Sequence, residues 1–273
     1  MDLMMSSCAE LGEMLQSTSS QSEIFNRSRA LLSNLALKPL FLKEIFRKYI
    51  IDDEFLKKRQ LTFDSNEITI FVDPAGQFSL RLYVWDPAKS YPVHSHGSWG
   101  VVAGVAGAIL ERKFKIVEKG DQQDFVKLRE SGRAILKPGD TTTVLPLDLG
   151  IHQMDAVVKE HASVGLHLYG KSIRRGYLEC YDLQKDSVYR IMNPYLYGRI
   201  IALRALGAIG EDWTAEMLNQ AAADKKPHIR YEAIRALANL DQEAALKYLD
   251  EELAAETKPA GDFEHLRRMI KNA

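Results

Sequence analysis

Two histidines separated by one residue stand in the segment YPVHSHGSWG at residues 91–100. Side chains two positions apart in a β-strand point to the same face, so His94 and His96 can bind one metal ion together if the segment is extended. A third ligand must come from elsewhere, and the best candidate is His152 in PLDLGIHQMDA, directly after a turn-like segment. The alternative is that the paired histidines are structural or surface residues of an ordinary strand.

A second polar pair with the same spacing lies in the segment ASVGLHLYG. His167 and Tyr169 share one face of the predicted strand, while leucines and a valine take the other face. We expect this polar face to point into the interior, beside the histidines. The alternative is a buried hydrogen bond between the two side chains that serves packing alone.

The segment FSLRLYVW has the same division between its two faces. Arg81, Tyr83 and Trp85 lie on one face, opposite phenylalanine, leucines and valine. If this polar face also points inward, Arg81 and Tyr83 contribute to a substrate site, where the guanidinium would bind a carboxylate with two parallel hydrogen bonds. The alternative is that Arg81 faces solvent on a half-buried strand.

The elements that carry these residues are short and extended. From about residue 61, segments rich in β-branched and aromatic residues alternate with Pro, Gly, Asp and Asn, which predicts an antiparallel sandwich or barrel. Before them, residues 24–55 have helical spacing, with Pro39 separating two helices and the Ser-rich STSSQSE capping the first.

The C-terminal part is helical and repeats itself. RIIALRALGAIGED begins at Arg199 and RYEAIRALANLDQE at Arg230, and Ala202 and Ala233 are 31 positions apart. A period of this size predicts a helical solenoid that resembles HEAT repeats. Such solenoids commonly form binding surfaces, so these helices could bind a protein partner. Their arginines are expected to lie on a solvated helix face or to form pairs within a helix.

These patterns give an α+β protein with three parts. Residues 1–56 are predicted to form N-terminal helices that pack on a barrel, residues 57–190 the antiparallel β-barrel with the metal site, and residues 191–273 the HEAT-like helical region. The chain has 273 residues, 46% of them hydrophobic, enough for a sizeable core. With 36 basic and 37 acidic side chains, nothing indicates nucleic acid or membrane as a partner.

The predicted compartment is the cytoplasm. The chain has only two cysteines, which is too few for a disulfide framework. Its first residues carry no basic run before an apolar stretch, so they do not resemble a signal peptide. The longest apolar run, VVAGVAGAIL at residues 101–110, is too short to span a bilayer.

The histidine motifs resemble a known superfamily. HSHGSWG with its downstream GVAG, and PLDLGIHQMDA, resemble the two motifs of cupins, which implies a double-stranded β-helix barrel. The usual first cupin motif has a Glu where this chain has Gly100 or Val101. A set of three histidines without a carboxylate resembles cysteine dioxygenase and related thiol dioxygenases. FSLRLYVW and SVGLHLYGKS are also similar to segments of that family, and the resemblance covers about residues 66–180.

This resemblance implies a non-haem iron site. His94, His96 and His152 would bind Fe(II), although imidazole also suits other divalent metals such as zinc and nickel. Tyr169 and His167 would position the substrates, which are O2 and a small thiol such as cysteine or 3-mercaptopropionate. The product would be the sulfinic acid.

Three positions depart from the family pattern. The serine two residues before His167 is replaced by Gly165, and the cysteine that forms a thioether crosslink in some members falls at about Val101. The arginine that clamps the substrate carboxylate is missing from EITIFVD, so Arg81 is the candidate replacement. Asp155 is expected either to accept a hydrogen bond from a ligand imidazole or to stabilise a turn.

Two other interpretations remain open at this point. The barrel could be a non-catalytic metal-binding or sensing cupin whose HEAT-like tail binds a protein partner. The same three histidines could also serve a different reaction, such as dioxygenolytic C–C cleavage or an isomerisation with another metal.

Overall fold

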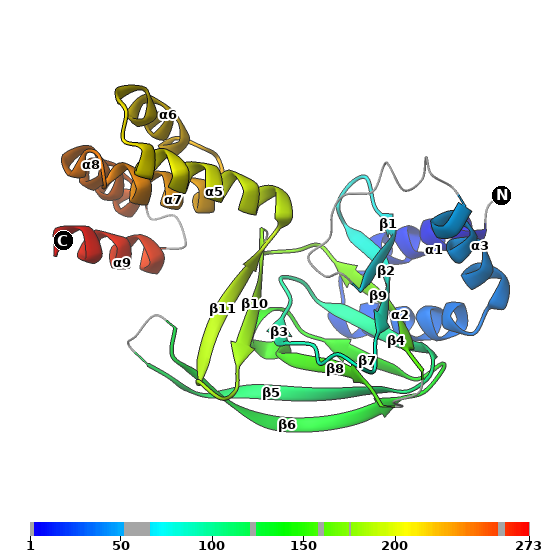
Figure 1. The fold of residues 1–273 in the computed structure, drawn as a ribbon. Coiled ribbons are helices and arrows are strands. Elements are labelled where there is room, and N and C mark those ends of the chain that lie inside the picture. Colours follow the sequence, from blue (N-terminus) through cyan, green and yellow to red (C-terminus); the bar gives the residue numbers. More distant parts are fainter. Residues whose placement is uncertain are drawn as a thin grey trace. The chain divides into compact units, whose positions relative to one another are not determined.

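The chain forms two compact units, Met1–Ile191 and Met192–Ala273, each described here by itself (Figure 1). The structure, a computed structural model, describes residues 3–51, 66–120, 124–157, 161–174, 176–255 and 260–272. The predicted boundary between residues 56 and 57 lies outside the described residues.

The first unit begins with helices α1 (Leu3–Gln16), α2 (Gln21–Ala36) and α3 (Pro39–Ile51). Ser20 caps α2, because its side-chain oxygen accepts a hydrogen bond from the backbone N–H of Glu23. Helix α3 starts at Pro39, whose fixed φ and missing N–H suit the first turn of a helix. The predicted capped start of α2 and the helix break at Pro39 are therefore confirmed.

Two sheets with antiparallel strand pairing follow the helices. The first has the order β1 (Glu67–Val72), β2 (Phe78–Trp85), β9 (Ser163–Gly170), β4 (Gly100–Ala106) and β7 (Thr141–Val144). The second has the order β11 (Ser187–Met192), β10 (Tyr177–Asp182), β3 (Val93–Ser95), β8 (His152–Ala156), β5 (Ile109–Lys119) and β6 (Val126–Leu136). The inner faces meet in one buried cluster, to which Tyr83 and Val102 contribute from the first sheet and Ile109 and Met154 from the second.

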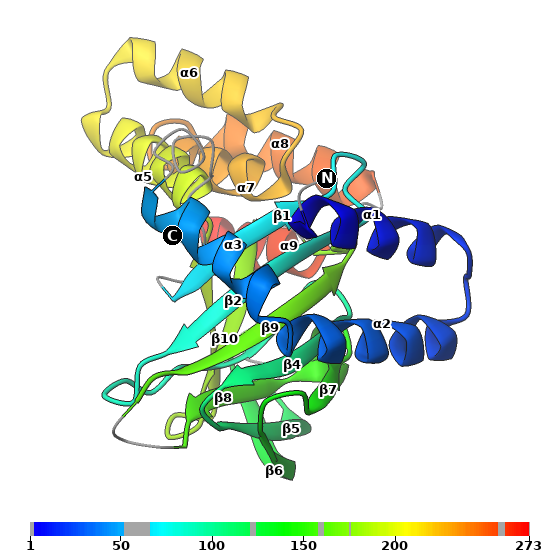
Figure 2. The ribbon, with the colours of Figure 1, turned by 90° about the vertical axis from the view of Figure 1, so that its right-hand side faces the viewer.

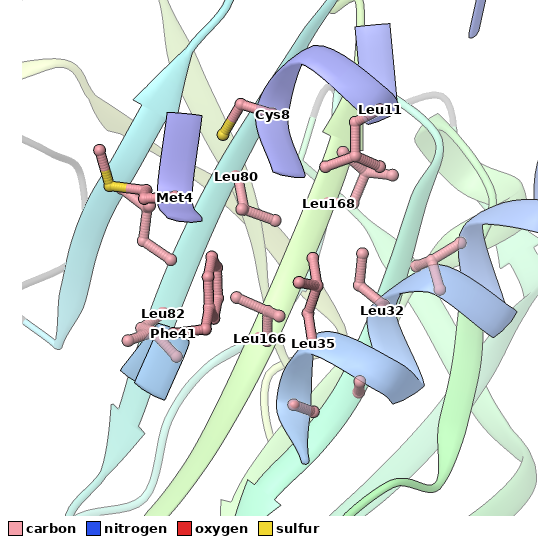
Figure 3. Close-up of a cluster of buried hydrophobic side chains, with 14 of the residues drawn as sticks. Met4, Cys8, Leu11, Leu32, Leu35, Phe41, Leu80, Leu82, Leu166 and Leu168 are labelled. Carbon is pink, nitrogen blue, oxygen red and sulfur yellow. The ribbon is translucent and has the colours of Figure 1, made fainter. Parts of the chain in front are cut away.

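The N-terminal helices cover the outer face of the five-stranded sheet (Figure 2). Leucines of β2 and β9 point outward into this layer and meet leucines of α2 and Phe41 of α3 (Figure 3). The buried side chains here include Leu32, Leu35, Leu80, Leu82, Leu166 and Leu168. Because side chains alternate along a strand, this outer leucine layer directs the intervening residues of β2 and β9 to the interior.

The second unit consists of α5 (Pro194–Ile209), α6 (Asp212–Ala222), α7 (Pro227–Leu237), α8 (Gln242–Ala254) and α9 (Ala260–Lys271). Ion pairs join helices that pack together: Arg204 of α5 donates two hydrogen bonds to Glu232 of α7, and Arg230 of α7 pairs with Glu252 of α8. The expectation of a solvated face or of pairs within a helix holds in part: Arg235 pairs with Glu232 inside α7, and Arg204 is half exposed. Arg204 and Arg230 also link neighbouring helices, which was not expected.

The predicted fold class is confirmed. The protein is α+β, with an antiparallel cupin-type barrel, N-terminal helices on one outer face, and a C-terminal HEAT-like helical region. Among the described helices, none combines the length and the apolar character that crossing a bilayer requires. The predicted cytoplasmic location stays a prediction.

Candidate metal centre

Strands β3 and β8 bring three histidines together. His94 lies in β3 opposite His152, the first residue of β8, and His96 follows the end of β3. The Nε2 atom of His96 lies 2.9 Å from Nε2 of His94 and 3.0 Å from Nε2 of His152. One ligand atom from each residue lies within 4.8 Å of the others, so the three imidazoles could hold one metal ion.

The turn before β8 aims His152 at the other two histidines. It is a 3₁₀ turn, Leu147–Gly150, whose first residue donates its backbone N–H to the carbonyl of His96 at 2.7 Å. A Cβ atom at Gly150 would collide with the carbonyl oxygen of Leu145, so the tight turn requires glycine there. The predicted turn-like segment therefore ties the third histidine to the backbone of the second.

The three facing nitrogens suit a cation. Nδ1 of His94 lies 3.0 Å from the carbonyl oxygen of Pro92, which can only accept, so Nδ1 carries the hydrogen and Nε2 presents its lone pair. Desolvation, together with the neighbouring His152, lowers the pKa of His94 to about 3. Desolvation and the neighbouring histidines also hold the pKa of His96 well below its ordinary value. Neutral imidazoles with converging lone pairs are the form in which histidine binds metals.

Glu111 of β5 contacts the third histidine. Its Oε1 atom lies 3.0 Å from Nδ1 of His152, which fixes the hydrogen on Nδ1 and leaves Nε2 free toward the cluster. Burial raises the pKa of Glu111, but His152, Lys113 and Thr142 outweigh that effect and hold the pKa below its ordinary value. Asp155 does not hydrogen-bond to His152. Its carboxylate accepts a hydrogen bond from the backbone N–H of Tyr91, in keeping with a structural role.

The His167–Tyr169 pair lies on the first sheet and faces the histidines. The Tyr169 hydroxyl is 2.9 Å from Nδ1 of His167 and 3.4 Å from Nε2 of His96. Nε2 of His167 is buried, with no hydrogen-bond partner in the described part of the chain. Desolvation holds the pKa of His167 well below its ordinary value. The pair therefore presents one hydroxyl to the candidate metal site.

Two glycines, Gly165 of β9 and Gly100 of β4, leave space for aromatic rings beside the His167–Tyr169 pair. A Cβ atom at Gly165 would lie 2.9 Å from Cζ3 of Trp85, so the indole ring occupies the space of the missing serine side chain. Gly100 of β4 lies opposite Tyr169, and a Cβ atom there would be 2.7 Å from the tyrosine ring. Val101 instead lies opposite Leu168 and joins the outer core, so the position predicted for the crosslink does not face Tyr169.

Arg81 is on the inner face of β2 but is already paired. Its Nη1 atom donates to Oε2 of Glu67 at 2.9 Å, and its Nε atom donates to Ser79 at 3.1 Å. The Tyr83 hydroxyl donates to the same Glu67 oxygen at 2.9 Å. The Arg81 Cζ atom lies 5.7 Å from the centre of the Tyr169 ring. Arg81 therefore lies near the histidines, but two of its three guanidinium nitrogens already donate hydrogen bonds to other residues. It is not placed to bind a carboxylate with two parallel hydrogen bonds.

Glu67 and Glu111 are the site residues that sequence reasoning missed. Both carboxylates are almost fully buried, with 1% of each side chain exposed. Glu67 begins the strand segment EITIFV, and Glu111 stands two residues after the buried Ile109 in ILERKF, which gives it the strand spacing of an inward-facing residue. An acidic residue at an inward position was the available signal, because buried carboxylates are rare unless they are paired.

Comparisons with known proteins found a family model for the C-terminal region and several distant solved structures. The sequence model for HEAT repeats matches residues 191–261. A cupin-like protein of Thermotoga maritima is 17% identical over 38% of this chain and 67% of its own, with a TM-score of 0.30. A hydroquinone 1,2-dioxygenase of Sphingomonas sp. TTNP3 is 13% identical over 46% of this chain and 77% of its own, with a TM-score of 0.31.

A sugar phosphate isomerase of the cupin superfamily from Silicibacter pomeroyi is 15% identical over 48% of this chain and 78% of its own, with a TM-score of 0.30. The solved structures thus include proteins with different activities on one architecture. At these identities and TM-scores the likenesses assign no activity to this chain.

Proposed function

We propose that this protein is a non-haem iron(II) thiol dioxygenase that uses O2 to oxidise a small thiol to its sulfinic acid. The observation that carries the proposal is the convergence of three imidazole Nε2 atoms, without a carboxylate among them, beside the hydroxyl of Tyr169. Three neutral ligands leave the charge of a divalent ion uncompensated, which favours an anionic thiolate as a further ligand.

The reaction needs no other reductant. Both oxygen atoms of O2 enter the product, the sulfur loses four electrons and O2 gains four, so RSH and O2 give RSO2H. Bound iron would supply the site where thiolate and O2 meet and exchange electrons. His94, His96 and His152 would hold that ion, beside the hydroxyl of Tyr169. The pKa values of His94 and His96 lie below the ordinary value, so neither imidazole needs to lose a proton at neutral pH before it binds the ion.

His167 and Tyr169 act on the substrates. In the tautomer with hydrogen on Nδ1, His167 donates to the Tyr169 oxygen, and the phenol hydrogen then points toward the site. That hydrogen would stabilise negative charge on sulfur or oxygen near His96. The aromatic rings of Tyr83 and Trp85 lie 4.5 and 5.4 Å from the His167 ring, centre to centre, and help to exclude water from it.

Arg81 and Tyr83 are proposed to contact the far end of the thiol. Glu67 engages Nη1 and Ser79 engages Nε, so Nη2 is the guanidinium nitrogen that remains for a substrate oxygen. One such contact suits a small thiol of the cysteine or 3-mercaptopropionate type, although it is weaker than a two-bond clamp.

Oxygen uptake tests this proposal. Freshly purified protein is analysed for metals, loaded with Fe(II), and given cysteine, 3-mercaptopropionate and 2-mercaptoethanol in an oxygen electrode. We expect O2 consumption and a sulfinate product with at least one thiol, and loss of both iron and turnover in His152→Ala. His161→Ala is the matched control, because His161 is exposed. No uptake with any thiol, or full uptake by His152→Ala, contradicts the proposal.

A second function has support from the C-terminal unit. The HEAT-repeat match and half-exposed side chains such as Tyr197, Ile201 and Trp213 favour a metal-binding or sensing cupin whose tail binds a protein. The tests that separate the two functions are the thiol panel and a pulldown with the full chain. One stoichiometric partner together with no oxygen uptake supports the second function.

A further inference from the structure

The carboxylate of Glu111 sits directly behind one of the three candidate ligands. Glu111 and His152 come from neighbouring strands, β5 and β8, and their side chains meet at 3.0 Å from Oε1 to Nδ1. Both are buried, at 1% and 2% exposure of the side chain. The contact is therefore out of water, where hydrogen bonds to charged groups are strong.

Other residues hold this carboxylate in place. The Thr142 hydroxyl donates to Oε2 at 2.7 Å, and Nζ of Lys113 lies 3.6 Å from the same oxygen. Thr142 belongs to β7 of the other sheet, so this bond joins the two inner faces. With donors on both oxygens, Glu111 is positioned as an anion whose orientation does not depend on His152 alone.

The three histidines thus have different outer partners. His94 donates to a neutral backbone carbonyl, whereas His152 donates to a full negative charge. Within the described residues, Glu111 is the one carboxylate that hydrogen-bonds to any of the three ligand imidazoles. A divalent ion held by three neutral imidazoles keeps a charge of +2, and a carboxylate one imidazole away is close enough to offset part of it.

We propose that Glu111 is a positioning residue that orients His152 and supplies a fixed negative charge to the cation site. This proposal rests on metal binding by the three histidines and does not depend on which reaction occurs there. It has two consequences of opposite sign. Removal of the charge weakens binding of the cation, and it strengthens binding of an added anion to the cation already in place.

Cobalt(II) and azide measure these two effects without any turnover. Co(II) affinity is measured by titration of the metal-free full chain, and azide affinity by the visible spectrum of the Co(II)-saturated protein. For Glu111→Gln we expect Co(II) to bind about 10–100-fold more weakly, and azide to bind roughly threefold to tenfold more tightly. Glu130→Gln is the control, since Glu130 pairs with Arg112 of the neighbouring strand β5 and with Arg133 of its own strand β6.

Each outcome decides a separate point. Co(II) affinity equal to that of the unchanged chain in Glu111→Gln overturns the proposal while the metal site stands. Weaker binding of both Co(II) and azide would mean that Glu111 has only a structural role, and this result also overturns the proposal. No Co(II) binding by the unchanged chain contradicts the metal centre, and the proposal with it. If Glu111→Gln does not fold, Glu111→Asp decides: weaker Co(II) with unchanged azide binding supports the proposal, and unchanged binding of both overturns it.

Discussion

The phenol oxygen of Tyr169 lies 3.4 Å from Nε2 of His96, although the two residues belong to different sheets. Gly100 leaves room for the tyrosine ring in this position, because a Cβ atom at Gly100 would lie 2.7 Å from that ring. A hydroxyl at this distance from a ligand nitrogen is within reach of any small molecule bound at the same ion.

Tyr169→Phe therefore tests the hydroxyl. We expect kcat/KM for the preferred thiol to fall about 100-fold, while iron content stays unchanged because none of the three ligands is altered. Steady-state oxygen uptake and metal analysis measure the two quantities. Tyr197→Phe, in the second unit, is the matched control with half of its side chain exposed. Equal activity of Tyr169→Phe and the unchanged chain would remove Tyr169 from the proposed reaction.

The Glu67–Arg81 pair predicts how strongly the site binds a thiol that carries a carboxylate, compared with an uncharged thiol. Glu67→Gln removes the anion that engages Nη1 of Arg81. We expect KM for 3-mercaptopropionate to fall about tenfold, equivalent to about 1.4 kcal/mol, and KM for the uncharged 2-mercaptoethanol to stay the same. Arg81→Met should raise KM for 3-mercaptopropionate alone. Equal changes for both thiols would place Arg81 outside the substrate site.

The metal-free protein should lose stability in acid because of its neutral histidines. Desolvation lowers the pKa of His94 to about 3, whereas an unfolded histidine titrates near 6.5. Below about pH 6.5 the unfolded state binds more protons, so the free energy of unfolding decreases as the pH falls toward 3. His94→Gln should flatten this slope by up to about 1.4 kcal/mol per pH unit. Urea unfolding between pH 5 and 7 measures it, and identical slopes would contradict the pKa shift.

The outer leucine layer predicts that the N-terminal helices stabilise the barrel. Leu168 is fully buried where β9 meets these helices. Leu168→Ala should lower the free energy of unfolding by about 2–5 kcal/mol, as measured in urea. Leu149→Ala, with 76% of the residue exposed, should change it by no more than about 0.5 kcal/mol. A similar small effect for both variants would show that the layer contributes little.

Local patterns predicted the strands and their faces, because a two-residue period is visible in one sequence. The separation of Arg81 and His167 from the leucines beside them followed from that period alone. The proximity of His152 to His94 depends on the pairing of β3 with β8, which one segment cannot reveal. The turn-like segment before His152 made it a candidate, and the resemblance to cupins strengthened that choice.

The outer partners of the site could not be predicted in the same way. Whether Asp155 or Glu111 contacts His152 depends on the registers of β8 and β5, and a shift of one residue would exchange the faces. The pairing of Arg81 with Glu67 likewise depends on the register of β1 and β2, which has an irregularity between Thr69 and Phe71. Such registers are properties of the folded sheet rather than of one segment.

Strand β3, only three residues long, has consequences for how the chain can be divided in the laboratory. Its neighbour on one side is β10, where Cys180 lies opposite His94, and β11 then leads toward α5. A shortened protein that stops before β10 would leave one edge of β3 without a partner strand, and β3 would then pair with β8 alone. Cutting after Met192 keeps that edge closed, so a barrel prepared without the helical repeats should end there.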